Sequence, residues 1–309
     1  MDYNAIKNQY KARTQLDALA TGLSLTTKSV REKHQAEKNA RDAELRQVRA
    51  EAAREAVMSS LVYACRIQKN LLPAVDTFKH AFSDYAILWN PRDIVSGDIY
   101  WIKNFDEGTI LCVCDCTGHG APGALLTMLV VSTFGMIVND QNYKEPATVV
   151  RMLDEQLSRA LYDSSKDEQN DMLDIRDGCD LAILYIPKEG DIAAASANFP
   201  IFICDGTEVT QIKGQKIFVG EGKITTDTVK TTFIPKSSNN KYYISSDGMF
   251  DQRGGPRGMP FGYSHFKKVI LENHNEPQAT ILEKVWSTFE NYRGDHPRKD
   301  DFELIGFRP

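Results

Sequence analysis

The sequence predicts an α+β protein in which one long helix precedes a domain built mainly of antiparallel strands. Residues 28–56 are rich in Ala, Glu, Lys and Arg and contain no Pro, Gly or aromatic residue, which is typical of a long helix. After Pro73, short apolar runs follow one another through turns rich in Gly, Asp and Asn. This order favours antiparallel pairing over alternating β-α-β units.

The N-terminal helix is expected to run from near Thr26 to Leu72, because Pro73 cannot continue it. Its last apolar positions follow the 4-3-4-3 spacing of a heptad seam, formed by Val57, Leu61, Ala64, Gln68 and Leu71. A lone exposed helix is marginally stable, so we expect this coiled-coil segment to form a homodimer. The alternative is a solvated helix on its own domain. We therefore divide the chain into a regulatory helical segment, 1–72, and a domain, 73–309.

Within the domain, the alternation of apolar runs and turns predicts the remaining elements in order. The expected strands cover residues 85–90, 98–105, 109–116, 181–187, 192–198, 199–206, 207–214, 228–235, 242–248 and 302–308. The expected helices cover residues 122–138, 146–162, 265–272 and 278–292. Residues 163–176 are expected to form a polar surface loop.

Composition excludes several classes of protein. The 309 residues carry 37 basic and 42 acidic side chains, a net charge of −5, so a protein that mainly binds nucleic acid is not expected. The apolar stretches are too short for a membrane span, and the N-terminus has no apolar signal core. The LCVCDC run lacks the spacing of a zinc site, so its three cysteines are expected to be buried core residues. We expect a cytoplasmic protein with reduced thiols.

Aspartates next to glycine mark the points where apolar strands end. The positions are Asp98, Asp115, Asp247, Asp300 and Asp301. Converging carboxylates repel one another unless a cation lies between them, and hard oxygen ligands favour Mg²⁺ or Mn²⁺. Ordinary turns are also rich in Asp and Gly, so turn residues remain the alternative.

The ordered motifs resemble the metal-dependent protein phosphatases of the protein phosphatase 2C class. These motifs are IQKNLLP, VSGDIYW, DCTGHGAPGALL, DGCDLAILYI, SANFP, SSDGMFDQRGGPRGMPFG and RKDDFELIGF. The similarity covers residues 63–309 and is strongest to the bacterial SpoIIE-like serine phosphatases. It implies a four-layer αββα sandwich, in which two antiparallel sheets are flanked by helices and a two-metal centre lies at one edge.

Matching the motifs implies a set of metal ligands, namely Asp98, Asp115 as the bridging ligand, the backbone carbonyl of Cys116, Asp247 and Asp300. The resemblance implies two Mn²⁺ or Mg²⁺ ions. Asp251 matches a position that holds a weaker third ion in some members. Asp301 is interpreted as a helper, although a register slip between Asp300 and Asp301 remains open.

The resemblance implies a metal-dependent phosphoserine/phosphothreonine protein phosphatase in bacterial signalling, which hydrolyses the ester with a metal-activated water. The implied substrate is a small phosphorylated regulator similar to a STAS-type anti-sigma-factor antagonist. One alternative is a catalytically inactive binding module with the same fold, and another is a metal-dependent phosphohydrolase of small molecules. Cys114 and Cys116 are not candidate nucleophiles, because no basic phosphate-cradling loop follows them.

Four further residues are candidates for substrate contact. Arg92 lies six residues before Asp98 and could bind the substrate phosphate, or it could be a surface residue. His119 could move a proton near the metal-bound water, or it could orient its turn. Arg253 and Arg257 lie in a Gly-rich segment that resembles a flap, where they could meet an acidic or phosphorylated partner or could be surface charges.

Overall fold

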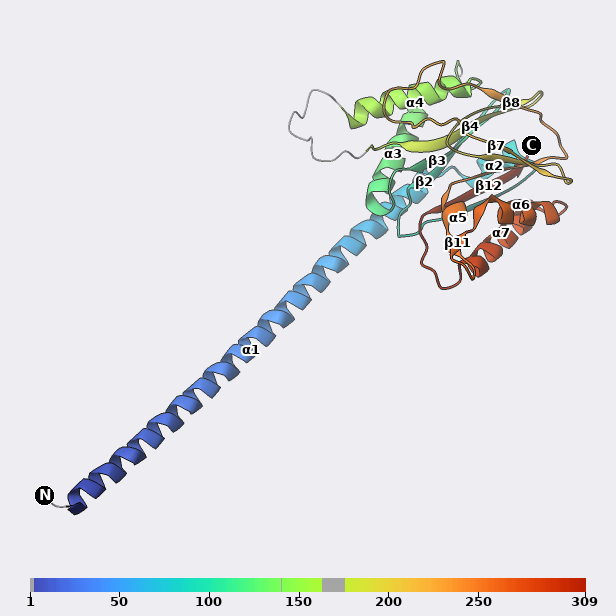
Figure 1. Ribbon diagram of the computed structural model, residues 1–309. Coiled ribbons are helices and arrows are strands. Elements are labelled where there is room, and N and C mark those ends of the chain that lie inside the picture. The colour runs from blue at the N-terminus through green and yellow to red at the C-terminus, as the bar shows by residue number, and fades with distance from the viewer. Residues whose placement is uncertain (1–2, 140, 163–175) are drawn as a thin grey trace. The chain divides into compact units, whose positions relative to one another are not determined.

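The computed structural model describes residues 3–139, 141–162 and 176–309 (Figure 1). The chain divides into two compact units, Met1–Ser60 and Leu61–Pro309. Most of the polar loop expected at 163–176 lies outside the described residues.

Helix α1 (Tyr3–Leu71) begins much earlier than the predicted start near Thr26. Residues 3–25 contain Ala, Leu, Lys and Gln, which are good helix formers, and the single Gly22 costs only about 1 kcal/mol. In the first unit every described side chain is exposed. This part of α1 therefore buries no apolar surface within its own unit.

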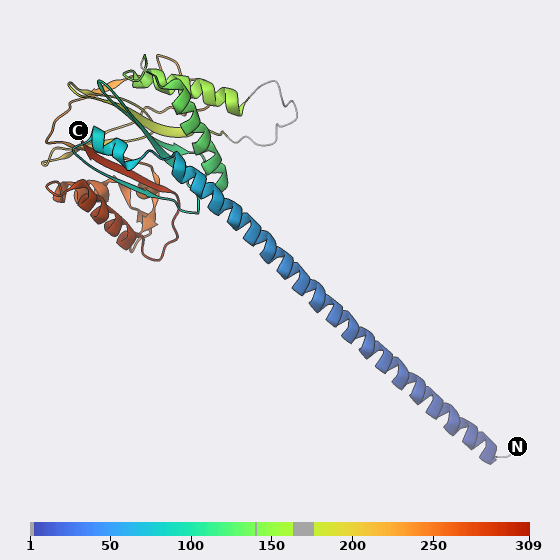
Figure 2. The same cartoon turned by 180° about the vertical axis from the view of Figure 1, so that it is seen from behind.

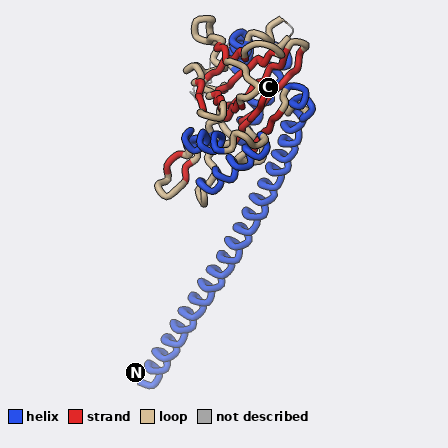
Figure 3. Tube along the Cα trace, turned by 90° about the vertical axis from the view of Figure 1, so that its right-hand side faces the viewer, coloured by secondary structure: helices blue, strands red, loops and turns tan. Residues whose placement is uncertain are grey.

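The second unit contains two five-stranded antiparallel sheets, which confirms the predicted fold class (Figure 3). In spatial order, the first sheet consists of β1 (Asp84–Asn90), β12 (Phe302–Arg308), β9 (Lys241–Ser245), β6 (Ile201–Cys204) and β7 (Val209–Ile212). The second consists of β2 (Asp98–Phe105), β3 (Gly108–Cys116), β4 (Cys179–Pro187), β5 (Ile192–Ala197) and β8 (Thr232–Ile234). All ten predicted strands are present.

Because side chains alternate between the two faces of each sheet, the buried residues form three core layers. One layer lies between the sheets, and one lies on the outer face of each sheet. Leu111 and Val113 of β3 meet Ile305 and Phe307 of β12 in the core between the sheets. Helices α3 (Gly120–Ile137) and α4 (Pro146–Leu161) cover the outer face of the second sheet. Helices α6 (Gly262–Glu272) and α7 (Gln278–Arg293) cover the first sheet on the opposite side (Figures 1 and 2).

Three short elements were not predicted, because each is too short to show a periodic pattern. They are α2 (Val75–Ala81), α5 (Gly248–Asp251) and the hairpin of β10 (Arg253–Gly254) with β11 (Met259–Pro260).

Helix α3 is, among the described residues, long and apolar enough to cross a membrane, with a mean hydropathy of 1.6 over 18 residues. The sequence analysis expected no such stretch, because polar and small residues interrupt its apolar runs. Half of this window is buried, and Val130 and Phe134 pack against the second sheet. The core helix of a soluble protein can have the same length and hydropathy, so these two properties are weak evidence for a membrane span.

The last turns of α1, from Leu61 on, belong to the second unit and are anchored in it by Gln68, which is fully buried. Its amide Nε2 donates to the Ser96 carbonyl (2.6 Å) and to Thr127 Oγ1 (2.9 Å), and its Oε1 accepts from the Ser96 backbone N–H (3.0 Å). Gln68 belongs to the heptad seam identified in the sequence. The structure uses this seam residue to hold the loop that leads into β2.

Candidate metal centre

Strand register places three aspartates side by side at one end of the second sheet. Asp98 of β2 lies opposite Asp115 of β3, and Asp115 lies opposite Asp180 of β4. Cross-strand partners share a face, and this face is the one that carries Val113 into the core between the sheets. Like charges directly opposite one another destabilise a sheet, so the arrangement indicates a site that requires a cation.

Asp98 is held rigidly in the interior, with 1% of its surface exposed. Its Oδ2 accepts a hydrogen bond from Ser246 Oγ (2.7 Å), and its backbone carbonyl accepts one from Trp89 Nε1 (2.9 Å). Burial, followed by the charge of Glu303, raises the pKa of Asp98 well above its ordinary value. Asp98 is therefore a fixed carboxylate in an environment that penalises its negative charge.

Asp115 experiences the same electrostatic environment from the neighbouring strand. Burial raises its pKa well above the ordinary value, and the charges of Asp98, Asp247 and Asp300 raise it further. Residues from four separate segments of the chain therefore act on one another electrostatically. The structure brings together the four predicted aspartate ligands.

Asp301 and Asp300 have different surroundings although they are adjacent. Both oxygens of Asp301 accept backbone hydrogen bonds at 2.7 Å, Oδ1 from Arg92 and Oδ2 from Gly97. Asp301 thereby ties down the loop that precedes Asp98. Among the described residues, the Asp300 carboxylate accepts one hydrogen bond, from the Asp301 backbone N–H (3.0 Å), which leaves most of its lone pairs available.

Asp247 and Asp251 lie at the two ends of the short helix α5. Burial raises the pKa of Asp247, and the charges of Asp251 and Asp300 add to this effect. Asp251 Oδ2 is 3.2 Å from Lys299 Nζ. A side chain at position 248 would collide with the Asp301 carbonyl, so only glycine lets α5 approach Asp300 closely.

Glycine also permits close contact between the loop that precedes β2 and the segment that follows β3. A Cβ atom on Gly97 would lie 2.5 Å from the Gly118 carbonyl and 3.2 Å from the Cys116 carbonyl. The Cys116 backbone N–H donates to the Gly97 carbonyl (2.9 Å). The backbone of Cys116 is thus packed against the loop that carries Asp98.

The sequence analysis assigned no role to two acidic residues of the site. Glu303 on β12 is fully buried, and neither carboxylate oxygen has a hydrogen-bond partner. Burial, and then the charges of Asp115 and Asp301, raise its pKa well above the ordinary value. The feature of the sequence that could have revealed Glu303 is a single charged residue inside the apolar run FELIGF. Asp180 was noted in the sequence without a role, and burial raises its pKa to about 6.

The donor set fits a hard divalent cation. In the described part of the chain, no three His, Cys, Asp or Glu side chains are yet arranged so that they could hold a metal ion. The site nevertheless concentrates buried carboxylates whose charges oppose one another, and Glu303 has no partner of its own. A cation would offset this repulsion, and carboxylate and carbonyl oxygens are the ligands that Mg²⁺ and Mn²⁺ prefer.

Arg92 and His119 meet at the rim through Asp93, a residue the sequence analysis did not single out. Asp93 Oδ2 lies 3.4 Å from Arg92 Nη2 and 3.2 Å from His119 Nδ1. Arg92 Nη1 also donates to the Lys299 carbonyl (2.8 Å). The structure therefore joins these two predicted residues in one polar network.

The hairpin of β10 and β11 holds the other two predicted arginines. Arg253 Nη1 donates to the Gly258 carbonyl (3.3 Å) within the hairpin. Within the described part of the chain, neither Arg253 nor Arg257 forms an ion pair with the carboxylates of the site. The structure does not bring these two residues into the carboxylate cluster.

The buried cysteines lie on the other face of the second sheet. Cys112, Cys114 and Cys116 pack beneath α3 and α4, as predicted for core residues. Cys114 Sγ lies 3.9 Å from Cys116 Sγ, and burial raises the pKa of both thiols well above the ordinary value. They face away from the carboxylates, on the side of the sheet that α3 and α4 cover.

Comparison with known proteins identifies the family. The model of the SpoIIE family (Stage II sporulation protein E) matches residues 106–309. The chain belongs to this family of bacterial serine phosphatases with a PP2C-type domain, as the sequence motifs predicted. A comparison with curated proteins found no match.

Solved structures show the same fold. The SiaA-PP2C domain of Pseudomonas aeruginosa is 28% identical, with a TM-score of 0.74 over 84% of this chain and 99% of that domain. The phosphatase domain of SpoIIE from Bacillus subtilis, solved with a fragment of its regulatory domain, is 16% identical, with a TM-score of 0.55 over 73% of this chain and 62% of that one. RsbX, solved in complex with magnesium, is 15% identical, with a TM-score of 0.48 over 73% and 94%. That last match is too distant to support any conclusion about this chain.

Proposed function

We propose that this chain is a metal-dependent phosphoserine/phosphothreonine protein phosphatase. The observation that supports the proposal most directly is the register of Asp98 opposite Asp115, in a family of serine phosphatases. Carboxylates that are buried, adjacent and mutually repulsive have a clear use as ligands of divalent cations. A binding module without catalysis would have no need to retain this arrangement.

The residues that would hold two Mn²⁺ or Mg²⁺ ions are Asp98, Asp115, Asp247, Asp300 and the backbone carbonyl of Cys116. When bound, such ions lower the pKa of a coordinated water and neutralise charge on the phosphoryl group. The chain itself supplies rigidity, because Ser246 orients the Asp98 carboxylate and Asp301 fixes the preceding loop. We assign Asp301 this positioning role, and Asp300 the role of ligand. A third ion at Asp251 would have to displace Lys299.

At the rim, Arg92 and His119 are suited to the substrate. The Arg92 guanidinium keeps donors beyond those used for the Lys299 carbonyl and Asp93, and a phosphate could accept them. Asp93 engages Nδ1 of His119, and the exposed ring leaves Nε2 free to give a proton to the departing serine oxygen. Asp93 is therefore a candidate positioning residue for both side chains.

The natural substrate that we propose is a small phosphorylated regulator of the STAS type, in the cytoplasm of a bacterium. Support for this substrate comes from the family resemblance, and the flap arginines Arg253 and Arg257 offer positive charge to a phosphorylated or acidic partner. Comparing phosphoproteins from cells with and without the enzyme tests it. A regulator whose phosphoserine persists only without the enzyme is the expected result.

Removal of metal is expected to abolish hydrolysis of p-nitrophenyl phosphate, because the water would keep its ordinary pKa. The assay compares the chelator-treated protein alone with the same protein after addition of Mn²⁺ or Mg²⁺. Activity that returns only with the ions supports the proposal. Equal turnover in excess chelator contradicts it.

We also propose that α1 forms a parallel homodimer through its exposed apolar residues. Leu16, Leu19, Leu23 and Val30 follow the 3-4-7 spacing of a heptad, and each is at least 65% exposed. In a coiled coil these side chains would bury apolar surface at roughly 25 cal/mol per Å². Self-association would thus stabilise a helix that buries nothing within its own unit.

Replacing Leu16 and Leu23 together by Glu is expected to convert the dimer into a monomer in sedimentation experiments. The added charges would repel one another across the seam. Gln35→Glu adds a negative charge to the same helix on the face away from this seam, and it should leave the dimer intact. A wild-type chain that sediments as a monomer at micromolar concentration would rule out the dimer.

A further inference from the structure

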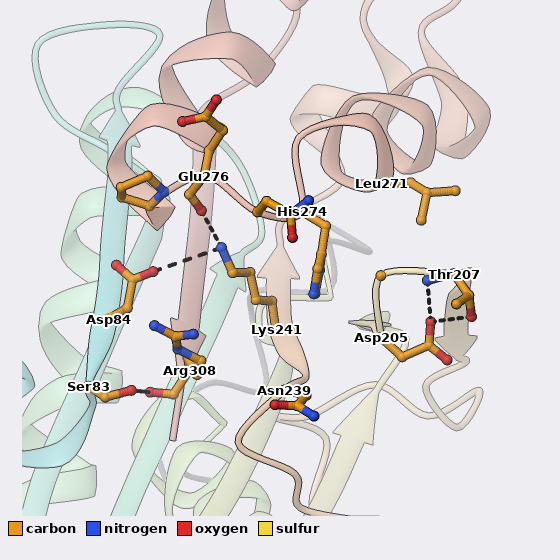
Figure 4. Close-up of a pocket in the computed structure, with 13 residues that line it drawn as sticks. Ser83, Asp84, Asp205, Thr207, Asn239, Lys241, Leu271, His274, Glu276 and Arg308 are labelled. Atoms are coloured by element: carbon orange, nitrogen blue, oxygen red, sulfur yellow. Dashed lines mark hydrogen bonds and ion pairs between the residues drawn. The ribbon is translucent and has the colours of Figure 1, made fainter.

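A polar pocket lies at the end of the first sheet opposite the carboxylate site (Figure 4). It has a volume of about 730 Å³, within the range of small-molecule sites. Lys241 begins β9 and Arg308 ends β12, whereas Asp247 follows β9 and Asp300 precedes β12. The same two strands therefore connect the two sites, and nothing in the proposed hydrolysis uses this pocket.

The acidic side chains in the lining are already engaged by the chain. Asp84 accepts the backbone N–H of Gln278 at the start of α7 (3.1 Å to Oδ2) and lies 3.9 Å from Lys241 Nζ. The Glu276 carboxylate lies 3.8 Å from Lys284 Nζ. Neither acid needs a cationic ligand from solution.

Asp205 is the third acid of the lining, and its own turn satisfies it. Its Oδ1 accepts hydrogen bonds from the Thr207 backbone N–H (2.7 Å), from Thr207 Oγ1 (2.8 Å) and from the Glu208 backbone N–H (2.9 Å) (Figure 4). These bonds lower the pKa of Asp205 to about 2. The negative charge of this residue is thus balanced by local donors.

The basic groups of the lining are not satisfied to the same extent. Lys241 is only 4% exposed and donates to the Glu276 carbonyl, which leaves further N–H donors. Within the described residues, the Arg308 guanidinium forms no hydrogen bond or ion pair. The buried Nδ1 of His274 has no partner either. All three side chains belong to the lining of the same pocket (Figure 4).

We propose that this pocket binds a small molecule that carries a phosphate or carboxylate group, with Arg308 as its principal contact. The planar guanidinium fork matches the paired oxygens of either group. Lys241 would add a buried positive charge behind the oxyanion, and His274 would gain the partner its Nδ1 lacks. The pocket is larger than an isolated oxyanion, so Asn239 and Asn275 in its wall are placed to contact the remainder of the ligand.

The test is calorimetric titration of the full-length Asp115→Asn protein in chelator with inorganic phosphate and, separately, with acetate. The Asp115→Asn change and the chelator remove hydrolysis and metal-bound phosphate from the readout, so failure of the proposed phosphatase activity cannot affect it. We expect saturable binding of at least one anion, and the anion that binds identifies the preferred head group. Adding Arg308→Gln should weaken that binding by about tenfold or more.

Two further variants make the outcome decisive. Adding Arg308→Lys keeps the charge but loses the fork, so intermediate affinity is expected. Adding Arg159→Gln removes a positive charge from α4, where Arg159 pairs with Glu155, and should leave the affinity unchanged. The proposal is overturned if neither anion binds, or if both Arg308 variants bind as tightly as the parent. If Arg308→Gln does not fold, Arg308→Lys alone decides the question.

Discussion

Asp115→Asn is expected to reduce metal-dependent hydrolysis of p-nitrophenyl phosphate by at least about a thousandfold, since removing a ligand that serves both ions sacrifices several kcal/mol of transition-state stabilisation. The same change should not destabilise the metal-free protein. Asp115 lies opposite Asp98 in the strand register and is repelled by Asp98, Asp247 and Asp300. A neutral amide of the same shape removes these repulsions.

The two effects are measured together. kcat/KM is determined with Mn²⁺, and the melting temperature is determined in chelator and again with Mn²⁺. The variant should melt at or above the wild-type temperature in chelator, and should gain less from Mn²⁺ than the wild type does. Asp191→Asn is the matched control, because Asp191 is exposed in the loop between β4 and β5 and is not one of the proposed ligands. An Asp115→Asn enzyme with wild-type kcat/KM would contradict the proposed centre.

The strands could be predicted from the sequence because most of them carry a clear alternation or a buried apolar run, whereas the two-sheet sandwich was implied by the resemblance to the phosphatase family. The same patterns predict where the strands end, and so they predict the positions of Asp98 and Asp115. The pairing partners of the strands cannot be predicted in this way, because the register depends on contacts between distant segments. The row of Asp98, Asp115 and Asp180 therefore became visible only once β2, β3 and β4 were aligned.

Other features depend on contacts that no local pattern records. The distinction between Asp300 and Asp301 rests on backbone N–H groups about 200 residues earlier in the chain. The pocket around Lys241 combines residues from the starts and ends of several strands and from the α6–α7 loop. Gln68 fits a heptad seam by spacing, yet its amide is committed to Ser96 and Thr127.

Glu303→Gln is expected to stabilise the metal-free protein at pH 7 and to have little effect near pH 4. The folded protein holds Glu303 where burial and the charges of Asp115 and Asp301 raise its pKa well above the ordinary value of 4.5. Between the two pKa values the folded state binds a proton that the unfolded chain has released. The stability associated with Glu303 is therefore complete below about pH 4.5 and is lost as the pH rises towards the folded-state pKa.

Gln has no proton to lose, so the variant should be free of this part of the pH dependence. Each pH unit above the unfolded pKa costs about 1.4 kcal/mol for as long as Glu303 stays protonated in the folded state, so the advantage of the variant should grow with pH. The measurement is urea-induced unfolding in chelator at pH 4.5, 5.5 and 7 for both proteins. Glu155→Gln on the exposed face of α4 is the control and should change the free energy of unfolding little at any pH. A difference between wild type and Glu303→Gln that does not grow with pH would show that Glu303 is not held protonated, and that a charged carboxylate is tolerated between the two sheets.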